Sequence, residues 1–249
     1  MNKLIVLCLV VLSTSAMATF KTDAGLSMIR TGGNTEVETY DAKIKSVKGW
    51  EKNSLTLGGH YTLGTSVEKD SAKASYNERV ESARNWDGYA RVDHLLSDKW
   101  DVFAQVQIEG NEFAGYKQRN NYDLGVKRVF IKDDKVNFFG EASARHTTEM
   151  TTARDEDGDD VFDYMKAVLY TEYNRKVSKT LSYKFWLQYV PNFTESEDYQ
   201  INFEPSFNVT LTDTFSMSMA YTGRFDNERN EGIEHRLDWT HTTSLIAKF

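Results

Sequence analysis

The sequence predicts one all-β domain, an antiparallel up-and-down transmembrane β-barrel of about twelve strands. Three observations lead to this prediction: hydrophobicity alternates with a period of two, short and long connections alternate along the chain, and the chain begins with an export signal. The mean hydropathy is −0.57, and no stretch after the N-terminus approaches the ~18 apolar residues of a spanning helix. The net charge of −7 disfavours nucleic acid as a partner.

Residues 1–18 have the layout of a cleaved signal peptide. Lys3 supplies the positive charge, Leu4 begins an apolar run that ends at Leu12, and small residues surround a cleavage site after Ala18. We therefore expect residues 1–18 to be removed and residues 19–249 to form the barrel. Cys8 is the single cysteine and lies in the apolar run, so the mature chain has no disulfide and no thiolate metal site.

The clearest alternation covers residues 199–211, where odd positions are apolar and even positions are polar. Successive side chains of a strand point to opposite faces, so this segment has one apolar and one polar face. Eleven other segments share the pattern, several with more exceptions. The expected strands are 22–31, 36–49, 54–66, 76–96, 100–111, 119–131, 136–148, 161–177, 181–194, 199–211, 215–226 and 234–249.

The connections fall into two sets. Short polar turns are expected at 51–53, 97–99, 132–135, 178–180 and 212–214. The other connections are 32–35, 67–75, 112–118, 149–160, 195–198 and 227–233, and four of these are long. Both termini then lie on the side of the short turns, which is the periplasmic side of an outer-membrane barrel. Aromatic residues gather near strand ends, as in interfacial girdles: Trp86, Trp100, Tyr183, Phe215 and Phe249.

A soluble β-sandwich is the competing fold, since its strands also have one apolar face. Its strands recur every 8–12 residues, which is closer than the spacing found here. Pro191 and Pro205 conflict with the barrel, because each removes a backbone donor inside an expected strand. We expect a bulge or a strand boundary at each proline.

Several segments resemble a known family, the salt-induced outer membrane proteins, which form family 481 of the domains of unknown function. The segment 25–35 with its Gly-Asn-Thr tip is similar to the first hairpin of that family, and 85–100 to its central hairpin. Phe113-Ala-Gly115, Arg119 and the strand at Leu124 also fit, as do 224–233, Asp238 and Phe249. The strand after Leu124 departs from the usual glycine-rich pattern. The resemblance implies an outer-membrane barrel, suggests induction under osmotic stress, and brings no catalytic residues.

If the apolar face meets lipid, the charged face lines the lumen. A charge on the lipid side costs ~2–4 kcal/mol at mid-bilayer for Arg or Lys, which excludes the opposite orientation. The expected pore-lining residues are Glu109, Asp123, Lys127, Glu141, Arg145, Lys184, Glu204, Arg224, Arg236, Asp238 and Lys248. These charges either tune a narrow pore for small solutes or form a salt-bridged plug.

Two chemical alternatives compete with a passive barrel. Asp155, Asp157 and Asp159 form an acidic run that could bind Ca²⁺, but its glycine is misplaced for an EF-hand, and a solvated outer loop is the simpler interpretation. An outer-membrane hydrolase needs a histidine beside a serine or carboxylate. His146 and His235 lie near acidic residues, yet surface or girdle positions account for all five histidines without catalysis.

The predicted protein is therefore a non-enzymatic outer-membrane barrel without a cofactor. Its most favoured role is a small passive pore or an envelope protein, with the segments 67–75, 112–118 and 149–160 screening access. The runner-up is a closed structural or adhesion barrel that acts through its outer loops. The expected partners are outer-membrane lipid, lipopolysaccharide and, through the C-terminal strand ending in Phe249, the barrel assembly machinery.

Overall fold

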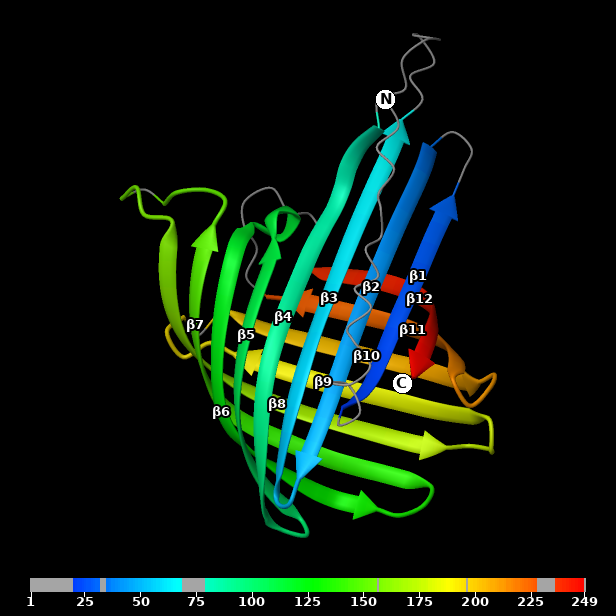
Figure 1. Ribbon diagram of the computed structural model, residues 1–249. Helices are drawn as coiled ribbons and strands as arrows, with labels where there is room; N and C mark the ends of the chain where they lie inside the picture. Colours follow the sequence, from blue (N-terminus) through cyan, green and yellow to red (C-terminus); the bar gives the residue numbers. More distant parts are fainter. Residues whose placement is uncertain are drawn as a thin grey trace.

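Twelve antiparallel strands close into one barrel in the computed structural model (Figure 1). The structure describes residues 20–31, 35–68, 79–155, 157–195, 197–227 and 236–248. Each strand pairs with its neighbours in the chain, and β1 pairs with β12 to close the ring. Figure 1 shows β1–β4 crossing in front of β8–β12, because tilted strands on opposite sides of a barrel run in different directions. The predicted fold class and strand number are confirmed.

The strands, in chain order, have the following bounds: β1 Lys21–Thr31, β2 Thr35–Trp50, β3 Asn53–Glu68, β4 Arg79–Ser97, β5 Trp100–Asn111, β6 Tyr116–Lys132, β7 Val136–Thr151, β8 Val161–Lys176, β9 Leu181–Pro191, β10 Tyr199–Thr210, β11 Phe215–Asp226 and β12 Leu237–Lys248. One short 3₁₀ helix, η1 Glu112–Ala114, lies between β5 and β6. No helix in the described ranges is long and apolar enough to cross a bilayer.

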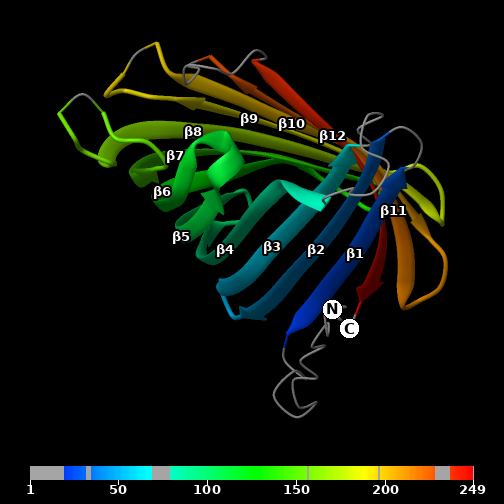
Figure 2. The same cartoon turned by 90° about the horizontal axis from the view of Figure 1, so that it is seen from above.

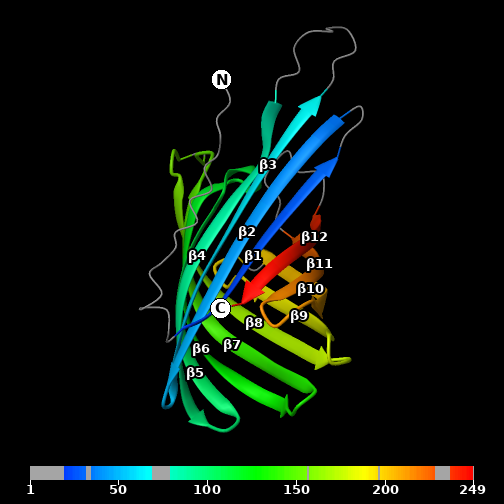
Figure 3. The same cartoon turned by 45° about the vertical axis from the view of Figure 1, so that its right-hand side comes forward.

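The ends of the barrel match the expected layout. The start of β1 and the end of β12 lie together, with Asp23 opposite Lys248, and the amide of Lys248 donates to the carbonyl of Thr214 in a short turn (Figures 2 and 3). One two-residue turn joins β2 to β3 through Glu51 and Lys52 and holds Glu51 at a φ of 47°. The first strand therefore begins, and the last strand ends, on the short-turn side, which is the periplasmic side in this class of barrel.

The ladder that closes the barrel is the shortest. Among the described residues, β1 and β12 share four residue pairs, from Asp23–Lys248 to Leu26–Leu245. The ladders on either side are longer, with eleven pairs between β1 and β2 and eleven between β11 and β12. We call the β1–β12 ladder the seam.

The distribution of side chains is inverted relative to a soluble protein. Within the described ranges only five apolar side chains are buried, and large apolar side chains such as Leu124 (71% exposed) cover the outside. The polar faces of the strands point inward, as the period-two pattern predicts. In a bilayer this outer surface contacts lipid, and the closed ladders satisfy the backbone groups that lipid cannot.

The two prolines have different outcomes. Pro191 ends β9, so the strand is shorter than the expected 181–194 because a boundary lies at the proline. Pro205 lies inside β10 without a register shift, so the bulge or strand boundary expected there is wrong. Its ladder to β9 is continuous, and the ladder to β11 omits Glu204 and Pro205 while keeping register. Thr222 on β11 donates its hydroxyl to Glu204 (2.8 Å), which supplies a side-chain contact across the gap.

Candidate functional site: the charged lumen

The lumen holds three adjoining cavities of about 800, 740 and 610 Å³. The first, here the upper cavity, is bordered mainly by β1–β4 and β9–β12. The second, the central cavity, is bordered by β2–β9, and the third, the mouth cavity, by residues at and near the short turns. Lys45 and Asp87 border both the upper and central cavities, and Asp101 and Lys127 border both the central and mouth cavities. Each cavity therefore adjoins the other two, since Ser182, Thr210 and Lys248 also border both the upper and mouth cavities.

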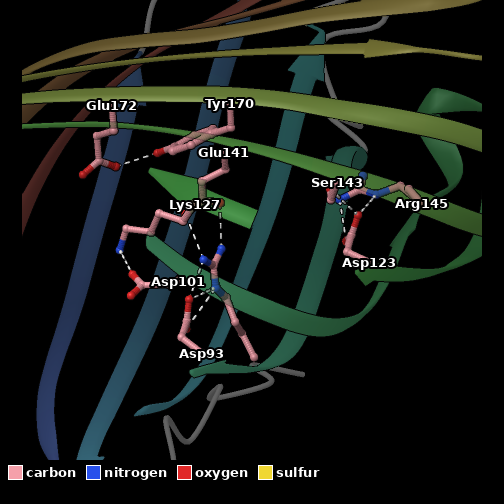
Figure 4. A network of polar contacts seen from close by, with 10 residues as sticks. Asp93, Asp101, Asp123, Lys127, Glu141, Ser143, Arg145, Tyr170 and Glu172 are labelled. Carbon is pink, nitrogen blue, oxygen red and sulfur yellow. Dashed lines mark hydrogen bonds and ion pairs between the residues drawn. The ribbon is translucent and has the colours of Figure 1, made fainter. Parts of the chain in front are cut away.

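Arg91 borders the central cavity and binds two carboxylates there. Arg91 on β4 donates to both oxygens of Glu141 on β7 (2.8 and 2.8 Å) and to Asp93 (2.7 Å), in the network of Figure 4. Its guanidinium lies 3.8 Å from the ring centroid of Phe103, which reaches into the lumen from β5. The fork of an arginine suits such a bidentate contact, which fixes both partners. The bonds to Glu141 join β4 and β7, which are not adjacent in the sheet.

Other charges on β5–β8 are paired in the same way. Arg145 donates to both oxygens of Asp123 (2.8 and 3.0 Å), whose side chain is 3% exposed. Lys127 lies 3.7 Å from Asp101. Tyr170 donates its hydroxyl to Glu172 (2.5 Å); these residues are labelled in Figure 4. We call the lumen face of β4–β8 the paired wall, since each of its lumen cations named here contacts a carboxylate.

A glycine makes room for the aromatic ring in this wall. Gly125 on β6 lies opposite Phe103, and a Cβ built on Gly125 would lie 2.6 Å from the Phe103 ring, from the carbonyl oxygen of Ala142 and from Ser143. Because a backbone oxygen is among these atoms, a larger residue cannot be accommodated by a side-chain movement alone. Gly125 therefore lets Phe103 lie flat on β6 beneath Arg91.

Two further ion pairs lie nearer the long connections. Arg119 on β6 donates to Glu149 (2.6 Å) and lies 3.5 Å from Glu109. Lys166 on β8 donates to Asp198 (3.0 Å), which is buried. The paired wall thus continues to the end of the barrel opposite the short turns.

His60 does not lie at the surface or girdle position that was expected for it. His60 on β3 lies in the upper cavity between two carboxylates, with Nε2 bonded to Asp41 and Nδ1 3.5 Å from Asp87, so a surface or girdle position is wrong for it. Ser27 and Thr62 also donate hydroxyls to Asp41 (3.2 and 2.9 Å). The centre of this cluster is a carboxylate that receives several donors.

The predicted pore-lining residues occupy three kinds of position. Four border the central cavity and four the upper cavity: Asp123, Lys127, Glu141, Arg145; and Lys184, Glu204, Arg224, Lys248. Glu109 lies beside Arg119 and accepts a bond from Asn121 (3.2 Å). Arg236 is exposed and donates to Asn227 (3.1 Å), so it borders none of the three cavities, and the side chain of Asp238 lies outside the described residues.

Other lumen charges were not predicted although their signal was present. Asp41, Lys43 and Lys45 alternate with apolar residues on β2, and all three border the upper cavity. The same alternation places Arg91 and Asp93 inward on β4. The alternation of these two strands is less regular than that of β10.

The two chemical alternatives find little support in the geometry. The carboxylate of Asp155 accepts bonds from the amides of Asp157 (3.0 Å) and Asp159 (2.8 Å), and no metal-ligating group occurs among the residues that the structure describes. The three aspartates therefore form a local turn rather than a convergent ligand set. His146 is half-exposed with Nε2 3.6 Å from exposed Asp163, and His235 lies outside the described residues.

Comparison with known proteins assigns the chain to a family. The family model "Protein of unknown function, DUF481" matches residues 24–249, so the chain belongs to this family. The chain is similar to the uncharacterized protein YdiY of Escherichia coli (strain K12), with 22% identity over 93% of this chain and 84% of that protein. The resemblance seen in the sequence is confirmed.

Two solved structures share the barrel fold. One is the NanC porin, with a TM-score of 0.51, 11% identity, and coverage of 92% of this chain and 97% of that chain. The other is an outer membrane channel from Pseudomonas putida F1, with a TM-score of 0.53, 10% identity, and coverage of 92% and 94%. Identities this low establish the fold alone. A closed barrel with an apolar exterior of this kind is an outer-membrane β-barrel, and we assign the chain to the bacterial outer membrane.

Proposed function

We propose that this protein is a passive pore for small hydrophilic solutes. The observation that supports this proposal most is the lumen itself, a series of three adjoining cavities with polar and charged borders. A barrel of about eight strands is filled by its own side chains, whereas twelve strands enclose a wider interior. A sealed barrel would not require open cavities with polar and charged borders.

The runner-up, a closed structural barrel, draws on the paired wall. Arg91 joins β4 to β7 through Glu141, and an interior held by such bonds could stay shut. The ion pairs of the paired wall, however, lie within β4–β8, except that Lys166 on β8 pairs with Asp198 in the connection after β9. They leave the upper cavity open. The proposal therefore treats the paired wall as one side of a channel rather than as a plug.

Single-channel recording in a planar bilayer tests the proposal. Residues 19–249 are refolded in detergent, folding is verified by a heat-dependent gel shift, and discrete current steps that grow with salt are expected. A folded barrel that passes no current would overturn the pore and direct the search to the outer loops.

A matched pair of variants locates the current in the lumen. Thr242 borders the upper cavity, while its neighbour Thr243 points to the other face of β12. Thr242→Trp is expected to lower the unit conductance, and Thr243→Trp is expected to leave it unchanged. Equal conductance in the two variants would show that ions do not pass through the upper cavity.

A further inference from the structure

Four cations of the upper cavity differ from those of the paired wall, whereas a fifth, Lys184, lies 3.8 Å from Glu172 on β8. Lys43 and Lys45 on β2, Arg224 on β11 and Lys248 on β12 border this cavity. Within the described ranges, none of these four side chains makes a hydrogen bond or a contact ion pair, and Lys45 interacts with Glu172 on β8 only at longer range. We call these four residues the cationic track. They lie on the seam strand β12 and on β2 and β11, which flank the seam.

The carboxylates of the same cavity are largely engaged. Asp41 and Asp87 contact His60, and Glu204 accepts the Thr222 hydroxyl (2.8 Å). The fourth, Asp23, pairs in register with Lys45 and Lys248, with no printed side-chain contact among the described residues. With Lys184 included, five lysine and arginine side chains therefore face four carboxylates in this cavity, a small excess of positive charge in a chain whose net charge is −7.

Basic residues continue from the track to the short-turn end of the lumen. Lys248 borders both the upper cavity and the mouth cavity. The mouth cavity is also bordered by Lys127, Lys132, Lys135, Arg175, Lys176 and Lys179, against the carboxylates Asp98, Asp101, Asp133 and Asp134. Cations thus outnumber carboxylates at the upper and mouth cavities, which Lys248 connects, whereas carboxylates outnumber cations at the central cavity.

Unpaired charge of one sign inside a low-dielectric wall attracts counter-ions. Clefts of this kind raise the local concentration of the opposite charge, and lysine or arginine side chains select anions in pores. On the paired wall each named cation lies beside a carboxylate, so that wall offers a passing anion no cation without a counter-charge. The cations that can attract an anion are those of the upper and mouth cavities.

We propose that the lumen selects small anions, including organic carboxylates, along the cationic track. This inference rests on the proposed pore function and adds the class of solute. Lys43 and Lys45 border the cavity from β2. Arg224 and Lys248 border it from β11 and β12, on the other side of β1, so a solute in the cavity would contact both pairs. No single tight site is required, because weak successive contacts favour passage.

The test is the reversal potential of the folded barrel between two KCl concentrations. Wild type is expected to favour chloride over potassium by roughly tenfold at low salt, the lower end of enrichment in a cleft of single sign. The preference is expected to fall at high salt, where the Debye length shrinks to about 3 Å. Replacement of chloride by acetate is expected to keep the sign of the potential.

Charge-neutral variants assign the effect to residues. Lys43→Gln with Lys45→Gln, and Arg224→Gln with Lys248→Gln, are each expected to bring the ratio to about one if the track supplies the field. The matched control is Lys48→Gln, because Lys48 on β2 borders none of the three cavities and lies 5.7 Å from the Phe20 ring. This control is expected to keep the wild-type ratio.

The outcomes separate the two proposals. A barrel without current contradicts the pore itself. Current with a chloride-to-potassium ratio at or below one overturns anion selectivity and leaves the pore intact. Chloride current without acetate current overturns the carboxylate part. An unchanged ratio in both double variants overturns the role of the track. If the gel shift shows that those variants do not fold, the chloride-to-potassium ratio of the wild type still decides the selectivity.

Discussion

The two sides of the lumen use charge differently. On the paired wall, Arg91 and Arg145 each bind a carboxylate through two nitrogens, and the partners are largely shielded from solvent. On the cationic track, Lys43 and Lys45 project into the upper cavity without such partners. Both sides follow the same inward-facing alternation, so the pattern of residue types alone does not distinguish them.

This difference separates stability from selectivity. A shielded ion pair costs free energy to break, because the remaining partner keeps a charge that water cannot reach. An unpaired lysine facing an open cavity is hydrated and contributes little to folding. We therefore expect variants of the paired wall to change the free energy of unfolding, and variants of the track to change ion flow.

The largest effect is expected for Arg145→Met. This change leaves Asp123, with 3% side-chain exposure, without its cation, and we expect the free energy of unfolding to fall by about 3 kcal/mol. Lys43→Gln on the track is the counterpart, with a change within about 0.5 kcal/mol. Urea unfolding in lipid vesicles measures both, and equal losses in the two variants would remove the distinction between the walls.

The next effect concerns the glycine beneath Phe103. Gly125→Ala places a methyl group 2.6 Å from the Ala142 carbonyl oxygen, and we expect a loss of about 2 kcal/mol from overpacking. The matched control is Gly88→Ala on β4, where a Cβ meets nothing within 4 Å. The same urea titration should leave that control as stable as wild type, and a Gly125→Ala barrel of wild-type stability would contradict the packing described here.

A smaller effect is expected for the hydroxyl of Tyr170. Tyr170→Phe removes its bond to Glu172, and a hydrogen bond to a charged group contributes about 1.5 kcal/mol. Glu172 keeps its bond from Asn174 (2.7 Å), which limits the loss. Tyr173→Phe on the same strand is the control, because that ring packs on the Phe138 ring at 6.2 Å on the other face. A larger loss for Tyr173→Phe would contradict this assignment.

The smallest effect is expected at a short turn. We compare the turn at Asp133, beside the paired wall, with the turn at Thr212, between β10 and β11. Asp133 accepts bonds from the amides of Lys135 and Val136 (2.8 and 2.7 Å), and Thr212 accepts equivalent bonds from Thr214 and Phe215 (3.2 and 2.9 Å). The backbone bonds from Lys135 and Val136 lower the pKa of Asp133 below its ordinary value. Its contribution is therefore present above the pKa of the unfolded chain and lost as pH falls through the lowered value.

Amide hydrogen exchange provides the measurement for these turns. After correction for intrinsic rates, protection of the Val136 amide is expected to decline when the pH drops below the ordinary range of aspartate. Protection of the Phe215 amide is expected to stay constant, because the Thr212 hydroxyl does not titrate in that range. Parallel declines at both amides would point to general opening of the barrel instead of titration of Asp133.

Local pattern was enough to predict most strands. The expected ranges 100–111 and 215–226 coincide with β5 and β11, since period-two alternation and turn residues are properties of neighbouring positions. The contact of Arg91 with Glu141 joins residues fifty positions apart across several strands, so it depends on the curvature of the closed barrel. His60 between Asp41 and Asp87 likewise depends on the register of β2, β3 and β4. Such register cannot be derived from alternation alone.

The seam has a consequence for how the molecule is assembled. Its four pairs join residues such as Asp23 and Lys248, which lie at opposite ends of the described chain, whereas the other ladders join neighbours in sequence. Bringing such distant segments together costs more chain entropy than forming a hairpin, and the short ladder returns little in exchange. Hairpins can therefore form from one strand to the next, but closure of the ring waits until β12 is available, and the seam is the last ladder to form.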